Sequence, residues 1–288
     1  MTLITAMEDE LKRRLQASTI SIQSVSGGDI NQAFKITTNT QNYFCKINSA
    51  YAFPDLFKKE AAGLSLIRNQ DVIITPEVIE VFQFENTQVL LLEWIDRGTE
   101  TETFWESFGK QLAALHHCHH ASFGLDDSNY MGTLRQSNEE RADWDAFFQE
   151  QRLEPLVRQC MDKNLLSTSH QKKFERLYKN LPVIFDQQAP SLVHGDLWSG
   201  NYLCNISSKP VLIDPAVYYG HPSIDLAMTT LFGGFPSSFY QSYNYHFPFP
   251  KNYSEQWSVC NLYPLLIHLL LFGRAYLHQI ENTLTQFD

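Results

Sequence analysis

The sequence has few of the features that mark secreted, membrane-bound or nucleic-acid-binding proteins. Its five cysteines are scattered and form no C-x-x-C pair, so we expect reduced thiols and a cytoplasmic protein. Residues 1–14 contain no signal-peptide core, and the longest apolar run, 262–273, is too short to span a bilayer. Only 22 Lys and Arg stand against 32 Asp and Glu, and the net charge of −10 argues against a nucleic-acid partner.

The composition is that of a folded protein, because 43% of the 288 residues are hydrophobic and 13% are aromatic. Apolar alternation favours strands at 19–25, 33–38, 43–47, 78–84 and 87–94, with helices at 3–17 and 56–68. Helical periodicity follows at 102–119, 139–161, 168–180, 222–231 and 255–280, with short strands near 202–206 and 210–213. We therefore predict an α+β protein with a small β-rich lobe at 1–95 and a larger helical lobe at 96–288.

The most informative segment is S-L-V-H-G-D-L-W-S-G-N at 191–201. Asp196 follows a short apolar run and Asn201 comes five residues later, which matches the H-x-D-x-x-x-x-N loop of phosphoryl-transfer enzymes. A second apolar run ends in Asp214, where such enzymes place the carboxylate that holds Mg²⁺ against the phosphates of ATP. If Asp196, Asn201 and Asp214 were ordinary turn residues, nothing would account for their spacing after the two apolar runs. The pattern therefore predicts Asp196 as the general base and Asn201 and Asp214 as magnesium ligands.

Two features of the first lobe indicate a nucleotide site. Gly27 and Gly28 lie in a turn between two predicted strands, where backbone N–H groups can approach a phosphate, although a plain turn is the alternative. The full G-x-G-x-x-G pattern is absent. Lys46 interrupts the apolar strand at 43–47, so its ammonium faces either an exposed edge or a negative charge.

Glu60 favours the second possibility for Lys46. It lies on the apolar face of the predicted helix, among Leu56, Gly63, Leu64 and Ile67. A carboxylate on that face needs a cation, and pairing with Lys46 would orient the lysine toward the α- and β-phosphates. Two alternatives are that Lys35 is the phosphate lysine, which no second feature supports, and that Glu60 reaches water beside neighbouring lysines.

Taken in order, Lys46, Glu60, the 93–95 linker, Asp196, Asn201 and Asp214 resemble the protein-kinase-like superfamily. Within it, the segments H-G-D-L-W-S-G-N (194–201) and D-P-A-V-Y-Y-G-H (214–221) resemble the fructosamine kinase (ketosamine 3-kinase) family. Further similarity lies at 132–138, 143–153 and 225–235, and the whole extends from about residue 20 to 276. The family pattern leads us to expect Glu at position 223 and Asn at position 267. This sequence departs from it, with Ser223 and Ile267.

The resemblance implies a two-lobed protein-kinase-like fold and an ATP- and Mg²⁺-dependent kinase that phosphorylates the 3-hydroxyl of a ketoamine (glycated amine). It implies that the backbone of Glu93, Trp94 and Ile95 pairs with adenine and that Asp225 braces the catalytic loop. We also expect Trp198 and His221 at the substrate. The flat indole of Trp198 suits the apolar face of a sugar, with packing beneath the loop as the alternative.

Other functions remain open at this point. A kinase of the same fold acting on choline, an aminoglycoside, homoserine or another small alcohol would keep the same phosphoryl-transfer residues. A non-catalytic nucleotide-binding scaffold is disfavoured, because all four of the expected chemical groups are present. His116 and His120 could share one helical face, as in some zinc sites, but no carboxylate lies in register and we expect no metal there. We expect no membrane partner.

Overall fold

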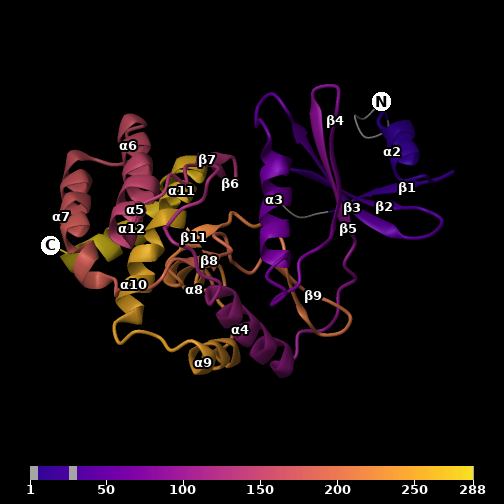
Figure 1. Ribbon diagram of the computed structural model, residues 1–288. Coiled ribbons are helices and arrows are strands. Elements are labelled where there is room, and N and C mark those ends of the chain that lie inside the picture. Colours follow the sequence, from indigo (N-terminus) through magenta and orange to yellow (C-terminus); the bar gives the residue numbers. More distant parts are fainter. Residues whose placement is uncertain (1–5, 26–30, 288) are drawn as a thin grey trace.

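The computed structural model describes residues 6–25 and 31–287, which form a β-rich lobe beside a larger helical lobe (Figure 1). The first lobe contains a five-stranded antiparallel sheet in the order β1-β2-β3-β5-β4. The strands are β1 (Ser21–Ser24), β2 (Gln32–Thr37), β3 (Asn42–Ser49), β4 (Val78–Phe84) and β5 (Thr87–Glu93). This architecture confirms the predicted α+β class. Whether the two lobes divide at residue 95 stays a prediction.

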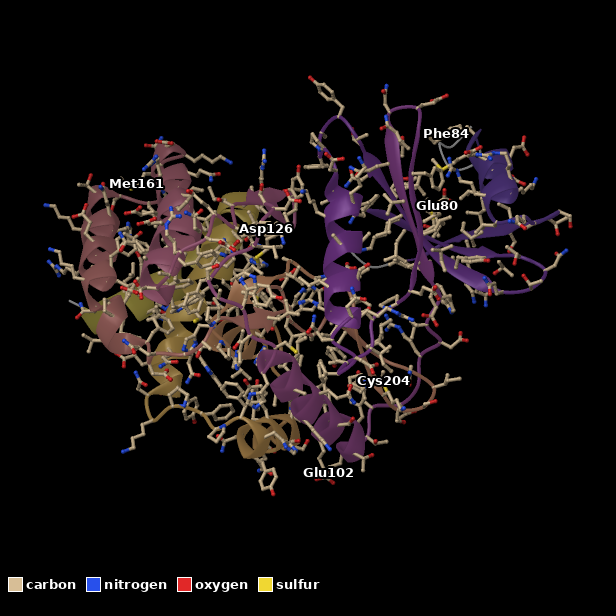
Figure 2. The ribbon with its side chains drawn as sticks, viewed as in Figure 1. Glu80, Phe84, Glu102, Asp126, Met161 and Cys204 are labelled. Carbon is tan, nitrogen blue, oxygen red and sulfur yellow. The ribbon has the colours of Figure 1, made fainter. Side chains whose placement is uncertain are left out.

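Strand β5 lies inside the sheet, and this position explains its nearly continuous apolar sequence. Residues 89–92 are each at most 2% exposed, since both faces of the strand are covered. Val89 and Leu91 join the core beneath α2 (Glu8–Arg14), and Glu80 on β4 forms an ion pair with Arg14 of this helix (Figure 2). The intervening residues Leu90 and Leu92 join a second core beneath α3 (Leu56–Arg68). Period-two alternation therefore places one helix against each face.

The described residues 102–287 contain nine α-helices, which form most of the second lobe. They are α4 (Glu102–His116), α5 (Trp144–Phe147), α6 (Glu154–Asp162), α7 (Thr168–Ile184), α8 (Ser223–Met228), α9 (Ser237–His246), α10 (Tyr253–Cys260), α11 (Leu262–Phe272) and α12 (Leu277–Leu284). Helices α4 and α9 lie against each other (Figure 1). A Cβ at Gly109 of α4 would lie 2.3 Å from the Phe239 carbonyl oxygen, so this close approach requires glycine.

Three short antiparallel strand pairs complete the second lobe. They are β6 (Asn129–Met131) with β7 (Leu134–Gln136), β8 (Ser191–Val193) with β11 (Tyr218–Gly220), and β9 (Tyr202–Cys204) with β10 (Pro210–Leu212). The second pair joins chain segments on both sides of the sequence that predicted the catalytic loop. Pairing of β8 with β11 therefore holds together the two ends of the segment that contains the predicted catalytic loop.

The predicted helices of the second lobe differ from the observed ones mainly at breaks. The prediction at 139–161 becomes a helix that starts at Trp144 and contains a π-helical turn, Phe148–Leu153. The prediction at 255–280 is divided into three, with the second break at Gly273, whose φ is +86°. Such a φ favours glycine and ends a helix, a cue that apolar periodicity alone does not capture.

No helix in residues 6–25 and 31–287 is long and apolar enough to cross a membrane. All five cysteines are unpaired. No cluster of three or more His, Cys, Asp or Glu suited to a metal ion occurs in residues 6–25 and 31–287, and His116 instead lies buried beside Asp225.

Candidate active site

The segment 194–214 brings the three predicted phosphoryl-transfer residues to one cavity. Strand β8 ends just before His194, and β10 ends just before the segment that carries Asp214. The side-chain amide of Asn201 donates to the backbone carbonyl of Asp196 at 2.8 Å and to its carboxylate Oδ2 at 2.9 Å. All three residues line a cavity of about 540 Å³. Asp214 adopts a φ of +54°, a conformation that is uncommon outside glycine and concentrated at functional sites.

Lys46 reaches the same cavity from the other lobe. Its neighbours Cys45 and Ile47 point toward α2, so alternation along β3 turns Lys46 toward α3. Its Nζ lies 2.8 Å from Oε1 of Glu60 and also contacts the carboxylate of Asp214. The Lys46 and Glu60 side chains are only 5% and 10% exposed. The structure thus brings Lys46 to Glu60, as the helix pattern indicated.

Burial and charge shift the pKa values of this ion pair. Burial alone would lower the pKa of Lys46, but Asp214 and Glu60 outweigh it and raise that pKa, so the lysine stays charged. Burial raises the pKa of Glu60 to about 7, against the opposing effect of Lys46. The lysine is therefore a fixed positive charge held between two lobes, which suits phosphate binding.

Burial and neighbouring charges shift the pKa of Asp196. Burial raises its pKa well above the ordinary value for aspartate, the hydrogen bond from Asn201 opposes the rise, and the charges of Asp214 and Asp225 add to it. A carboxylate with a raised pKa binds a proton more readily than an ordinary aspartate does. The side chain keeps a partly exposed edge in the cavity, where an acceptor hydroxyl can approach.

Asp225 on α8 holds the loop that carries Asp196. Its Oδ2 accepts the backbone N–H of His194 at 2.7 Å and its Oδ1 accepts that of Gly195 at 2.8 Å, which confirms the expected bracing contact. Gly195 has a φ of +82°, and a Cβ there would lie 2.2 Å from the Ala216 carbonyl oxygen. Only glycine fits this turn without displacing backbone.

A second layer, which the sequence did not reveal, supports Asp225. Nε2 of His116 lies 3.2 Å from Oδ2 of Asp225, and the hydroxyl of Tyr243 on α9 lies 2.7 Å from Nδ1 of His116. His116, Asp225 and Tyr243 are each 0% exposed. The His-rich run ending α4 therefore contributes a buried loop support, and helix α9 is connected to the catalytic loop through it.

His194 is a structural element of the loop. Its Nδ1 accepts the backbone N–H of Asp196 at 3.2 Å, and its Nε2 lies 2.9 Å from the Ile213 carbonyl, to which it donates. Burial lowers the pKa of His194, which agrees with a neutral ring in this position. The imidazole thereby connects the segment that carries Asp196 to the one that carries Asp214.

The sequence of this chain matches a known protein family. A sequence model of the fructosamine kinase family matches residues 3–287. The chain belongs to the fructosamine kinase family. It is 40% identical over 268 residues to a probable ketoamine kinase of Lactiplantibacillus plantarum, covering 92% of this chain and 94% of that one. It is 33% identical to the chloroplastic protein-ribulosamine 3-kinase of Arabidopsis thaliana, covering 88% of this chain and 78% of that one.

Solved structures agree with this family membership. A crystal structure assigned as a fructosamine-3-kinase from Haemophilus somnus has a TM-score of 0.87 at 26% identity, covering 98% of this chain and 96% of that one. An aminoglycoside phosphotransferase, crystallised with AMP-PNP and hygromycin B, has a TM-score of 0.67 at 14% identity, covering 97% and 98%. The second likeness shows the shared protein-kinase-like fold alone.

The other predicted nucleotide contacts lie outside the cavity or outside the described residues. Lys35, the competing lysine, places its Nζ 4.4 Å above the ring of Trp94 and not at Glu60. Glu93 is the last residue of β5, and Trp94 and Ile95 follow it. None of the three is among the residues that line the cavity. Their pairing with adenine stays a prediction. Gly27 and Gly28 fall outside the described residues.

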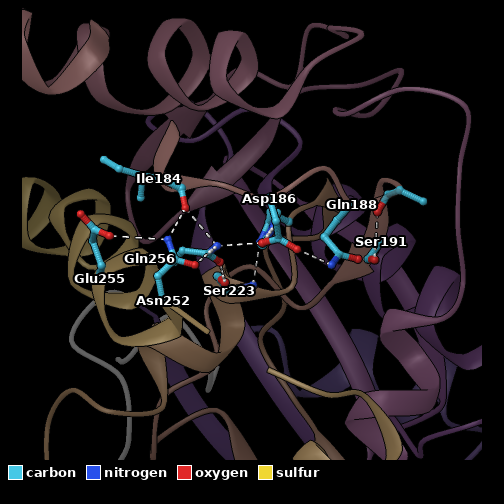
Figure 3. Close-up of polar contacts among 10 residues, drawn as sticks. Ile184, Asp186, Gln188, Ser191, Ser223, Asn252, Glu255 and Gln256 are labelled. Carbon is cyan, nitrogen blue, oxygen red and sulfur yellow. Dashed lines mark hydrogen bonds and ion pairs between the residues drawn. The ribbon is translucent and has the colours of Figure 1, made fainter. Parts of the chain in front are cut away.

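The two expected substrate residues have different surroundings. Trp198 lines the cavity. His221 does not: it is 2% exposed, and its Nε2 lies 3.5 Å from Oδ1 of Asp186. Figure 3 shows the polar cluster around Asp186, in which Gln256 donates to Asp186 at 2.7 Å and accepts from Ser223 at 2.8 Å. His221 is thus placed to support this cluster, and Ser223 belongs to the same cluster. A contact between His221 and the substrate stays a prediction.

Sequence reasoning also missed a buried polar network beneath the cavity. The guanidinium of Arg152 is 0% exposed, lies 4.0 Å from the ring of Tyr218 and donates to Oδ1 of Asn138 at 2.7 Å. Asn138 in turn donates to Oδ1 of Asn129, which lines the cavity. Asn138 and Arg152 lie in the segments 132–138 and 143–153, whose family resemblance was noted without indicating that these side chains meet.

Proposed function

We propose that this protein transfers the γ-phosphoryl group of ATP to the 3-hydroxyl of a ketoamine, the adduct of a sugar and an amine. The observation that carries the proposal is the convergence of Lys46, Asp196, Asn201 and Asp214 on one cavity in a chain of the fructosamine kinase family. The choice of the third carbon follows the names of its relatives, a protein-ribulosamine 3-kinase among them.

In this proposal Asp196 orients the acceptor hydroxyl and takes its proton as the oxygen attacks phosphorus. General-base assistance of this kind contributes about 10²–10⁴-fold to a rate. Lys46 balances the charge of the ATP phosphates, because its ammonium is fixed between Glu60 and Asp214. In-line attack needs both substrates to be held in register, and loop bracing by Asp225 contributes to that.

The residues at the cavity fit a magnesium ion. Asn201 directs its amide nitrogen to Asp196, which leaves its amide oxygen available, and the carboxylate of Asp214 lies partly exposed in the cavity. One carboxylate and one amide oxygen, completed by phosphate oxygens and water, are a typical donor set for Mg²⁺. When bound there, the ion would neutralise charge developing on the transferred group. The two protein ligands are Asn201 and Asp214 in this proposal.

The test measures ADP release from Mg²⁺·ATP with fructosyl-lysine, ribulosyl-lysine, choline and an aminoglycoside as acceptors, and without any acceptor. The proposal predicts turnover with the ketoamines and a phosphate ester on the third carbon of the product, identified by phosphorus and carbon NMR. Turnover with choline or the aminoglycoside alone would retain the mechanism and refute the substrate class. Binding of ATP without any acceptor-dependent ADP would favour a scaffold.

A further inference from the structure

The cavity is lined by two chemically distinct sets of residues. The charged set performs the phosphoryl transfer described above. The second set is a row of five rings that begins two residues after Asp196, and we call it the aromatic wall: Trp198, Phe232, His268, Phe272 and Tyr276. Neighbouring ring centroids lie 5.9 Å apart for Trp198 and Phe232, and 4.8 Å apart for Phe232 and His268. The ring of His268 lies 5.4 Å from that of Phe272 and 4.9 Å from that of Tyr276.

Two rings of the aromatic wall are exposed to solvent, and the backbone of one of them is strained. Phe232 and Phe272 are 39% and 52% exposed, although large apolar side chains are usually buried. Phe232 has a φ of +53°, in the left-handed region where a bulky residue is a strained outlier. Its carbonyl accepts a hydrogen bond from Ser199 of the catalytic loop at 3.3 Å. Strain that keeps an aromatic ring at the cavity beside the catalytic loop points to a ligand contact.

His268 provides a polar acceptor within the wall. Its Nδ1 donates to the Pro264 carbonyl at 2.8 Å, which places the ring proton on Nδ1 and leaves a lone pair on Nε2. Burial lowers the pKa of His268, so the ring is neutral near pH 7. No partner for Nε2 is found within residues 6–25 and 31–287. A neutral acceptor among aromatic rings suits a cation that carries N–H donors.

Among the described residues, the cavity offers no unpaired lysine or arginine that would bind a carboxylate. The residues packed around the wall are the apolar Met228, Ile267 and Leu271, and Ile267 stands where the family pattern predicts Asn. Both lysines of the cavity are already paired with carboxylates, Lys46 with Glu60 and Lys59 with Asp127 at 3.0 Å. The net charge of −10 adds a repulsive field for anionic acceptors.

We propose that the aromatic wall is the subsite for the amine half of the ketoamine. The ring faces and Nε2 of His268 hold the protonated amine nitrogen, and Phe232, Phe272 and Tyr276 contact an uncharged apolar substituent, with aromatic groups preferred. The inference rests on the proposed function, because the sugar half must reach Asp196 for the amine half to lie along the wall. It makes the protein selective against ketoamines that carry a carboxylate next to the amine nitrogen, as the glycine adduct does.

The experiment compares three acceptors that share one sugar and differ only in the amine: the adducts of benzylamine, ethylamine and glycine. The kcat/KM at saturating Mg²⁺·ATP is expected to fall in that order. We expect the benzylamine adduct to exceed the glycine adduct by roughly 10- to 100-fold, the range over which a hydrophobic pocket discriminates such groups. Equal values, or a preference for glycine, would overturn the inference.

Variants separate a specific subsite from a general effect on folding. Phe272→Ala should lower kcat/KM for the benzylamine adduct about tenfold and that for the ethylamine adduct much less. His268→Leu should raise KM for both adducts, and His268→Gln, which keeps an acceptor, should restore part of the loss. Tyr51→Ala removes a ring that is 91% exposed in the other lobe and is the matched control, expected to change nothing. A folding defect would lower both adducts equally, which would contradict a subsite.

The outcomes also distinguish this inference from the proposed function. Turnover of all three adducts without dependence on the amine, or on Phe272, would refute the subsite and leave the ketoamine kinase assignment intact. Failure to phosphorylate any adduct, with turnover of another alcohol, would refute the proposed function and this inference together.

Discussion

Replacing Asp225 with Asn tests how strongly the catalytic loop depends on one buried carboxylate. Asp225 accepts two backbone N–H bonds, from His194 and Gly195, and its Oδ2 also lies beside His116. Asparagine offers one acceptor oxygen, so one loop amide would face an NH₂ group instead. Losing one charge-assisted hydrogen bond costs about 1.5–3 kcal/mol, and the stranded buried N–H costs about 1–3 kcal/mol more. The two costs together give an expected loss of about 2.5–6 kcal/mol in the free energy of unfolding.

Thermal unfolding followed by circular dichroism measures this loss directly. A change of 1 kcal/mol moves Tm by about 2–4 °C in proteins somewhat smaller than this one, so we expect a decrease on the order of 10 °C. The kcat should fall as well, because the loop that carries Asp196 loses an anchor. The KM for ATP should change less. Asp126→Asn makes the same chemical change at an exposed position and is the control. A D225N protein with wild-type Tm and kcat would refute the bracing role.

Three further predictions concern the groups around ATP. Asp196→Asn should reduce kcat about 10²–10⁴-fold and leave Tm equal or higher, since burial destabilises the charged form; an active D196N enzyme would remove Asp196 as the base. Lys46→Met should lower kcat/KM for ATP, measured beside Lys35→Met, and the reverse ranking would point to a different nucleotide pose. Turnover should fall as the pH decreases, because Asp196 becomes protonated. The midpoint of the pH profile of kcat/KM should lie above about 3.9, the ordinary pKa of aspartate. A midpoint at or below that value would contradict the raised pKa of Asp196.

The sequence was most informative where function restricts both residue type and spacing. The Asp196–Asn201 spacing and the position of Asp214 predicted residues that the structure brings to one cavity. Glu60 was located by an energetic argument, because a carboxylate on an apolar helix face requires a partner, and Lys46 is that partner in the structure. The helix predicted at 56–68 coincides with α3, because its apolar periodicity is strong and uninterrupted.

Long-range contacts account for what the sequence could not predict. Tyr243 and His116 are 127 residues apart, and no local pattern shows that they meet above Asp225. Helix α9 lies in a segment rich in Phe, Tyr and Pro, where its packing on α4 outweighs weak local preference. His221 looked like a substrate residue because it ends a conspicuous motif, yet tertiary packing places it against Asp186. The aromatic wall likewise combines residues from separate segments.

The most direct test of the central claim measures acceptor-dependent ADP release from Mg²⁺·ATP by wild-type protein and by D196N, with a ketoamine, choline and an aminoglycoside as acceptors. The account predicts turnover of the ketoamine by the wild type, a phosphate on its third carbon, and loss of that turnover in D196N. Phosphorylation of choline or the aminoglycoside in preference to every ketoamine, or equal activity of the two proteins, would contradict it.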